Sequence, residues 1–96
     1  MFARVTISET PLDKIDLAIK VINEEIIPAV KKIPGYEGGY WLGDRANGKG
    51  ITITLWESEE ALKAGEDAVK QLRSDAAKRL DLKIGSIDRY EVLGEG

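Results

Sequence analysis

The chain has 96 residues, 14 of them basic and 17 acidic, so its formal net charge at pH 7 is −3. This length predicts one domain, and the even mixture of the two signs of charge gives no indication of nucleic-acid binding. Because the sequence contains no Cys and no His, it excludes disulfides, thiolate nucleophiles, catalytic triads built on either residue, and the commonest metal ligands. We therefore predict no metal site, and any catalysis must use carboxylates, Tyr, Lys, Arg, the backbone or the substrate itself.

Hydropathy gives no indication of a membrane protein. The chain has no run of about 18 apolar residues, and its first residues lack the basic stretch and short apolar segment of a signal peptide. We therefore expect a cytoplasmic protein with no membrane contact.

The first residues, from Phe2 to Ser8, are predicted to form a strand, because apolar and polar side chains alternate along them. One face of this strand would hold Ala3, Val5 and Ile7, and the other face Arg4 and Thr6. An alternating strand of this kind is typical of a sheet that is covered on one side only.

A helix is predicted to begin at Thr10-Pro11, since Thr supplies a capping oxygen and Pro is tolerated at the first helical position. Apolar side chains then recur at three- and four-residue steps, as on a helix that packs on a core. They are Leu12, Ile15, Ile19, Ile22, Ile26 and Val30. Pro28 is expected to kink or end this helix near Ile27, because it removes one hydrogen bond and crowds the preceding turn.

The segment from Gly43 to Gly50 (GDRANGKG) matches the opening of a phosphate-binding loop, G-x-x-x-x-G-K. Two features argue against that function. The lysine is followed by Gly50 instead of Ser or Thr, and the next residues, Ile51 to Trp56, alternate as a strand does and not as a helix. Asn47-Gly48 is instead typical of a two-residue hairpin turn, so we predict a hairpin between this strand and a preceding one, Tyr36 to Asp44.

A two-residue turn at Asn47-Gly48 determines the register of this hairpin, because paired positions then have numbers that sum to 95. One face of the hairpin becomes apolar, and its pairs are Leu42 with Ile53 and Tyr40 with Leu55. The other face is mixed, and its pairs are Trp41 with Thr54, Gly43 with Thr52, and Gly39 with Trp56. In this register the glycines leave space around the indoles.

Ser58 is predicted to cap a second helix, with Glu59 and Glu60 in the first turn, where negative charge is favoured. The apolar face of this helix would hold Leu62, Val69, Leu72, Ala76 and Leu80. Gly65 interrupts it at a cost of about 1 kcal/mol relative to Ala, which close packing or a pocket would explain. Residues Lys83 to Leu93 suit a last strand, whose faces the pattern leaves unassigned.

The resulting order is strand, helix, strand, strand, helix, strand, which is the ferredoxin-like α+β arrangement with a four-stranded antiparallel sheet. Two helices would cover one side of the sheet and leave the other side open. We expect the open face to carry the mixed set of side chains, Arg4, Thr6, Glu37, Trp41, Thr52, Thr54 and Trp56. Each tryptophan can bury about 150 to 250 Å², so we predict a homodimer in which the second copy covers them.

Three stretches of the chain together resemble antibiotic biosynthesis monooxygenase domains. They are Pro28 to Tyr36 (PAVKKIPGY), Gly39 to Leu42 (GYWL) and Ile53 to Ala61 (ITLWESEEA). The resemblance covers nearly the whole chain, as one domain over residues 1–96, and it implies a dimeric α+β barrel with a cavity between sheet and helices or near the interface. It also implies that a small aromatic phenol or quinol is oxidised by molecular oxygen without a metal or flavin cofactor.

The same resemblance directs attention to polar and aromatic residues as a substrate-binding site. Those expected to bind substrate are Arg4, Tyr36, Tyr40, Trp41, Thr54 and Trp56. Arg4 or Arg89 would stabilise a phenolate, one of the tyrosines, including Tyr90, would donate a hydrogen bond, and the two indoles would stack on a planar ring. The catalytic base is not identified.

Two alternatives to an enzyme remain open. One is a dimer that binds a small ligand without turnover, and the other is a structural or regulatory dimer with a filled interface. Haem degradation, which relatives with a histidine ligand carry out, is set aside because this chain has no His. Oxygen uptake with phenols separates the enzyme from a ligand-binding protein, and saturable ligand binding separates the two alternatives from each other.

Overall fold

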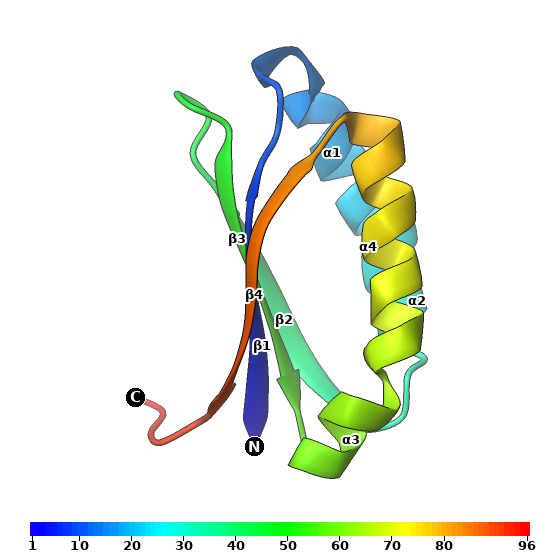
Figure 1. The fold of residues 1–96 in the computed structure, drawn as a ribbon, viewed down its shortest axis with the longest axis vertical. Coiled ribbons are helices and arrows are strands. Elements are labelled where there is room, and N and C mark those ends of the chain that lie inside the picture. The colour runs from blue at the N-terminus through cyan, green and yellow to red at the C-terminus, as the bar shows by residue number, and fades with distance from the viewer.

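The computed structural model describes residues 1–96 as one twisted sheet with helices packed on one of its faces (Figure 1). The strands are β1 (Phe2–Glu9), β2 (Tyr36–Gly43), β3 (Lys49–Trp56) and β4 (Lys83–Glu91), in the spatial order β2-β3-β1-β4. Every neighbouring pair of strands is antiparallel. The predicted ferredoxin-like α+β fold with a four-stranded antiparallel sheet is confirmed.

Two helical segments cover one face of this sheet, and the other face is uncovered (Figure 1). The first segment runs through a 3-10 turn (Leu12–Lys14), α1 (Ile15–Val21), a π-helical turn (Ile22–Ile26) and α2 (Ile27–Val30). The second consists of α3 (Glu59–Ala64) and α4 (Glu66–Leu80). All these helices are too short or too polar to cross a membrane.

The first helical segment differs from its prediction at its start, and of the two outcomes predicted at Pro28, a kink or an end near Ile27, the second does not occur. No side chain caps its start, and the backbone N–H of Thr10 instead donates to the carbonyl of Gly48 at 2.8 Å. The segment does not end near Ile27 but runs past Pro28 to Val30. Proline offers no N–H, and the helix accommodates it with the preceding π turn, in which the N–H of Ile27 binds the carbonyl of Ile22 five residues earlier.

The second helical segment starts at the predicted cap and breaks at the predicted glycine. The Ser58 hydroxyl accepts a hydrogen bond from the backbone N–H of Ala61 at 3.1 Å. Gly65 separates α3 from α4, and a Cβ placed there would lie 3.0 Å from Ile33 Cγ2 and 3.2 Å from two ring atoms of Trp56. The glycine therefore lets the helix approach the indole closely, and close packing is its explanation.

The connection between β2 and β3 is a hairpin, as predicted, but its loop is longer than two residues. The N–H of Asp44 donates to the carbonyl of Lys49 at 2.8 Å, which leaves Arg45 to Gly48 as the loop. Within it only Gly48 has a positive φ, 77°, whereas a type I′ turn requires positive φ at Asn47 as well. The side-chain oxygen of Asn47 accepts a hydrogen bond from the N–H of Lys49 at 2.9 Å, so asparagine closes this loop through its side chain.

The longer loop shifts the register of the hairpin by two residues. Paired positions sum to 93, so Tyr40 lies opposite Ile53 and Trp41 lies opposite Thr52. Every pair predicted from a sum of 95 is therefore wrong. Because the shift is an even number, each side chain still stays with its predicted companions on one face, and the division into an apolar and a mixed face is confirmed.

The assignment of these two faces to the helices and to the open side was reversed. The mixed face lies under the helices, where Arg4, Thr54 and Trp56 are only 2%, 4% and 0% exposed. The apolar face is the open one, with Tyr40 64% and Leu42 51% exposed. The prediction that a partner covers the tryptophans is wrong for Trp56, because its own chain already buries it. The physical reason is that the helices cover a cavity and a charged network instead of a purely apolar core.

Strand β4 completes both faces of the sheet. Its pairing with β1 sets Arg89 opposite Arg4 and Tyr90 opposite Ala3, so Arg89 lies on the helix side and Tyr90 on the open side. The register between these strands shifts between Ile7 and Ser8. Such an irregularity reverses the alternation along one strand, which explains why the sequence pattern left the faces of β4 unassigned.

Candidate functional site

A cavity of about 310 Å³ lies between the sheet and the helices. Its wall is mainly aliphatic and comes from the helical segments and the entry to β4. The aliphatic residues that these elements contribute are Ile15, Ala18, Ile19, Ile22, Ile26, Val30, Val69, Leu72, Ala76, Leu80, Leu82 and Ile84, and Leu42 near the end of β2 also borders the cavity. A cavity of this size with an apolar wall and a few polar groups is typical of a small-molecule site, so it is the candidate functional site.

The sheet side of this cavity is built from the mixed face. Thr6 on β1 pairs with Thr52 on β3, and Thr52 pairs with Trp41 on β2, so these three side chains cross the sheet in one row. Thr54 lies two residues further along β3 and also lines the cavity. The strands therefore line the cavity with an indole and with the hydroxyl-bearing side chains of three threonines and of Ser8 on β1, and a ligand otherwise meets mainly aliphatic carbon.

One end of the cavity is lined by the β2–β3 hairpin, with Asp44, Arg45 and Lys49. Arg45 also forms an ion pair with Asp16 of α1, at 3.1 Å between Nη1 and Oδ1. Both side chains are mostly exposed, at 69% and 89%, so this pair contributes little stability. The hydrogen bond from Thr10 N–H to the loop is the better-protected contact that holds the hairpin near the first helical segment.

Trp56 lies behind the cavity wall, in a core cluster with Val30 and Leu62. Its indole Nε1 donates to the Thr54 hydroxyl at 3.1 Å. Tyr36 packs on the indole edge-to-face, with ring centroids 5.6 Å apart, and burial raises the pKa of Tyr36. These contacts hold the side chain of Thr54, which lines the cavity, against the indole of Trp56.

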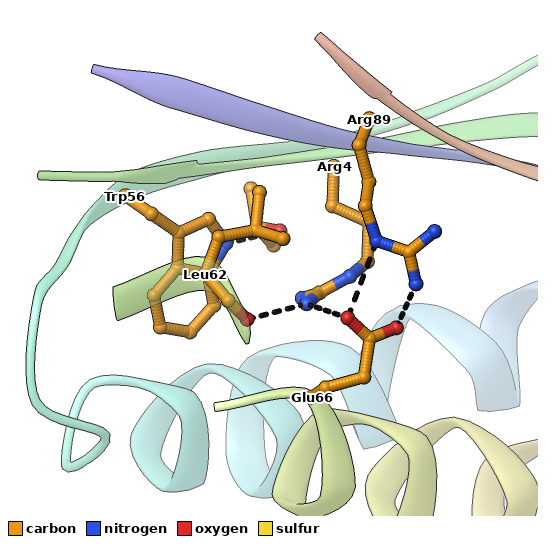
Figure 2. A network of polar contacts seen from close by, with 6 residues as sticks. Arg4, Trp56, Leu62, Glu66 and Arg89 are labelled. Carbon is orange, nitrogen blue, oxygen red and sulfur yellow. Dashed lines mark hydrogen bonds and ion pairs between the residues drawn. The ribbon is translucent and has the colours of Figure 1, made fainter. Parts of the chain in front are cut away.

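A charged network lies beside Trp56, between the sheet and the start of α4 (Figure 2). The buried Arg4 donates through Nη2 to the carbonyl of Leu62 at 3.0 Å and to Glu66 Oε2 at 3.1 Å. Arg89 donates to the same carboxylate through Nε and Nη2. The Arg4 guanidinium also lies 5.5 Å from the centre of the Trp56 ring, a cation–π contact. The network thus joins β1, β4 and α4 through one glutamate.

Glu66 is ionised in this network. Its burial alone would raise its pKa, but the hydrogen bonds and charges of Arg89 and Arg4 outweigh burial and lower the pKa of this carboxyl. A carboxylate whose pKa is lowered is a weak general base near neutral pH. Glu66 therefore serves to hold two guanidinium groups in place.

Arg73, seven residues after Glu66 on α4, lines the cavity. It takes part in none of the six ion pairs of the chain. Burial lowers the pKa of Arg73, and the charge of Arg4 lowers it further, whereas Glu66 opposes that shift and Arg89 adds to it. The surroundings thus disfavour the positive charge of this side chain, and the one group that favours it, Glu66, is already bound to Arg4 and Arg89.

The structure brings most of the predicted substrate-binding residues to one region. Two of them line the cavity, Trp41 and Thr54. Three lie behind its wall. They are Trp56 and the two residues that contact its ring, Arg4 and Tyr36. Tyr40 is on the open face of the sheet, as is Tyr90, so neither tyrosine reaches the cavity.

Sequence reasoning missed two charged residues of this region, Glu66 and Arg73. Arg73 follows Val69 by four residues and precedes Ala76 by three, so it lies on the helix stripe that was predicted to face the core. A charge on such a stripe was a usable signal. Glu66 gave no such signal, because only the fold brings it next to Arg4 and Arg89.

Comparison by sequence finds distant relatives of unknown activity. The chain matches no protein-family model. It is 32% identical over 77 residues to the uncharacterised protein Rv2558 of Mycobacterium tuberculosis, a match that covers 80% of this chain and 33% of that protein. The chain therefore spans about a third of the length of the curated relatives it matches.

Solved structures share the fold over the whole chain. A protein of Deinococcus radiodurans proposed to be an antibiotic biosynthesis monooxygenase has a TM-score of 0.77 at 19% identity, covering 100% of this chain and 95% of that one. The heme degrader MhuD of Mycobacterium tuberculosis, which was solved with two hemes in its active site, has a TM-score of 0.74 at 21% identity, with 100% and 99% covered. The monooxygenase ActVA-Orf6 of Streptomyces coelicolor, in complex with nanaomycin D, has a TM-score of 0.70 at 15% identity, with 99% and 88% covered. This chain therefore shares the fold of these proteins, one of which is proposed to be an antibiotic biosynthesis monooxygenase.

Proposed function

We propose that this chain binds a small planar phenol or quinol in its cavity and oxidises it with molecular oxygen, without a metal or flavin. The observation that carries the proposal is the cavity itself, about 310 Å³ in volume, with an aliphatic wall and with an indole and threonine hydroxyls on the sheet side. Two structures of similar fold that are named as monooxygenases support the same class of reaction. Because likeness of fold does not establish activity, the proposal depends on what the cavity binds.

The proposed reaction requires an electron-rich substrate, since triplet oxygen reacts slowly with closed-shell molecules. Loss of the phenolic proton makes the substrate electron-rich, and the phenolate then gives one electron to oxygen. The phenoxyl radical and superoxide combine to form a carbon–oxygen bond at an unsubstituted ring carbon, and the peroxide takes up a proton. Loss of the hydrogen on that carbon, with cleavage of the O–O bond, leaves a quinone and releases water. Each phenol consumes one oxygen molecule, one atom of which enters the quinone and the other the water.

The residues of the cavity would bind and orient the ring and exclude water. Trp41 offers a flat surface for stacking, and Thr6 and Thr52 present hydroxyls in the same row that can donate to or accept from oxygen substituents. The aliphatic wall keeps the dielectric constant low, which strengthens the interactions of a developing negative charge with its surroundings.

We further propose that the functional unit is a homodimer formed through the open face of the sheet. The side chains of this face are apolar and half-exposed or exposed, and they include Val5, Ile7, Tyr40, Leu42, Ile51, Ile53, Leu55 and Tyr90. A contiguous apolar face of this kind is typical of an interface, because leaving it in water is unfavourable. A second copy laid against it would form a dimeric α+β barrel.

The proposed activity is tested by oxygen consumption with a panel of naphthols, dihydroxynaphthalenes and anthrone, combined with detection of the quinone product. The test variant is Val69→Phe, which fills the cavity from α4. Its matched control is Ala68→Phe, which places the same side chain at the adjacent, exposed position. We expect Val69→Phe to reduce oxygen uptake at least about tenfold, because loss of about 1.4 kcal/mol of substrate binding has that effect, and Ala68→Phe to leave it unchanged.

Two results would contradict the proposed enzymatic activity. Saturable binding of these compounds without oxygen uptake would indicate a ligand-binding protein without turnover. Absence of both binding and uptake would favour a structural or regulatory dimer.

A further inference from the structure

The charges of the network beside Trp56 and of Arg73 on the cavity wall do not balance. Arg4, Arg73 and Arg89 carry three positive charges and Glu66 carries one negative charge, so their sum is 3 − 1 = +2. No further charged group contributes to the lowered pKa of Arg73. Arg4 is buried and Arg73 is half-buried, whereas the side chain of Arg89 is 45% exposed. A guanidinium that is partly withdrawn from water without a counter-charge is unfavourable, so the cluster favours one more anion beside Arg73.

The side chain of Arg4 shows the deficit in its hydrogen bonds. It is 2% exposed, and only its Nη2 has partners. Its Nε and Nη1 are buried and have no hydrogen-bond partner, whereas buried donors in proteins are nearly always paired. The carboxylate of Glu66 cannot supply the missing acceptors alone, because Arg89 also uses both of its oxygens.

Arg79 lies on the same helix as Arg73, α4, and shows the contacts of an arginine with a structural role. Arg79 lies at the surface and donates two hydrogen bonds to Glu25, at 2.6 and 2.9 Å. Arg73 lines the cavity and has no ion-pair partner. Packing does not account for Arg73 either, since an apolar side chain would continue the stripe of Val69 and Ala76. An unpaired charge in a cavity wall is instead typical of a ligand site.

We infer that the Arg73 end of the cavity is an anion subsite, and that the ligand of the proposed site carries an oxyanion on a planar ring. The chemical class is an aromatic carboxylate or an ionised phenol, whose flat, delocalised charge matches a flat guanidinium. The aliphatic wall disfavours a phosphate ester, because more than one charge would have to leave water. This inference rests on the proposed function and specifies the charge that its ligand carries.

The test compares three ring compounds of similar size that differ in charge, 2-naphthoate, 2-naphthol and 2-naphthalenemethanol. Anaerobic calorimetric titration at low ionic strength and about pH 7 measures their dissociation constants for the wild type and for Arg73→Gln. Arg79→Gln is the matched control, because it removes the same charge from the same helix outside the cavity. Thermal unfolding verifies that both variants fold, and Arg73→Gln is expected to unfold no lower than the wild type, since it removes an unpaired charge.

We expect the wild type to bind 2-naphthoate at least about tenfold more tightly than the neutral alcohol. Arg73→Gln should lose that preference while its affinity for the alcohol stays the same, and Arg79→Gln should keep it. An absorbance change showing that 2-naphthol is bound as its anion would assign the subsite to the reacting hydroxyl. A preference limited to 2-naphthoate would assign it to a carboxylate substituent, and either result supports the subsite.

Three outcomes would overturn the inference. Equal affinity of the wild type for 2-naphthoate and the alcohol would exclude the subsite and leave the proposed function intact. A preference that survives in Arg73→Gln would place the source of charge selectivity elsewhere in the chain. Failure of all three compounds to bind would overturn both the subsite and the proposed function.

Discussion

The two faces of the sheet differ in a way that their coverage alone would not lead one to expect. The face under the helices carries Arg4, three threonines and both tryptophans, and the uncovered face carries isoleucine, leucine, valine and tyrosine. A sheet whose helices covered a solid core would have the opposite arrangement. The difference teaches that polar alternate positions of a strand can mark the wall of a binding cavity, while the apolar positions mark contact with another chain.

The two faces also differ in how they contribute to stability. Side chains under the helices are buried by their own chain, as Trp56 is at 0% exposure. Side chains of the open face gain most of their burial only if a second chain covers them. Substitutions on the first face should therefore change the free energy of unfolding, and substitutions on the second face should change association.

The largest expected effect is on folding, from Trp56→Ala. Removal of a fully buried aromatic side chain leaves a cavity and should lower the free energy of unfolding by about 3 to 5 kcal/mol, measured by urea denaturation at several protein concentrations. Tyr40→Ala is the matched change on the open face. Its side chain is 64% exposed, so the cost in a monomer should stay below about 1 kcal/mol. Similar costs for the two variants would remove the distinction between the faces.

The next effect is on association, from Ile51→Glu on the open face. An unpaired carboxylate buried in an interface costs several kcal/mol, so the dissociation constant of the dimer should rise about 100-fold or more, measured by light scattering over a range of concentrations. Leu17→Glu on α1, where the side chain is 46% exposed on the helical layer, should leave the dimer intact. A monomer mass for the wild type at micromolar concentration would contradict the homodimer.

The smallest expected effect concerns acid stability and Glu66→Gln. The pKa of Glu66 is lowered from its ordinary value of 4.5, so the folded state binds this proton less readily than the unfolded chain. The carboxylate therefore contributes stability that is present above about pH 4.5 and is lost as the pH falls through the lowered folded-state pKa. Because the side chain is 28% exposed, we expect Glu66→Gln to cost about 1 to 2 kcal/mol near neutral pH.

Urea midpoints between about pH 3 and pH 7 measure this effect and its pH dependence. The curve for Glu66→Gln should fall less steeply below about pH 4.5 than that of the wild type. Glu37→Gln, at an exposed position without an ion pair, is the control and should follow the wild type. If Glu66→Gln kept the wild-type slope, the network would not contribute to acid sensitivity.

The local features of this fold could be predicted from the sequence. Alternation identified β1 and the two hairpin strands, and Ser58 identified the start of α3. These features depend on residues that are neighbours in the chain, so their causes are visible in a short window. The hairpin loop shows where this limit lies, since Asn47 has two ways to form a turn and the choice shifted the register by two residues.

The sequence by itself determined the order of the elements, the separation of each strand into two faces, and the resemblance to antibiotic biosynthesis monooxygenase domains. It did not determine which face meets the helices, because alternation is symmetrical and the usual preference for an apolar core is reversed around a cavity. Only the tertiary structure decided that Arg4, Arg89 and Glu66 meet, and that Arg73 faces the cavity beside them without a partner. Contacts between distant segments depend on how the helices pack on the sheet, and the free energy of a buried charge depends on every group around it.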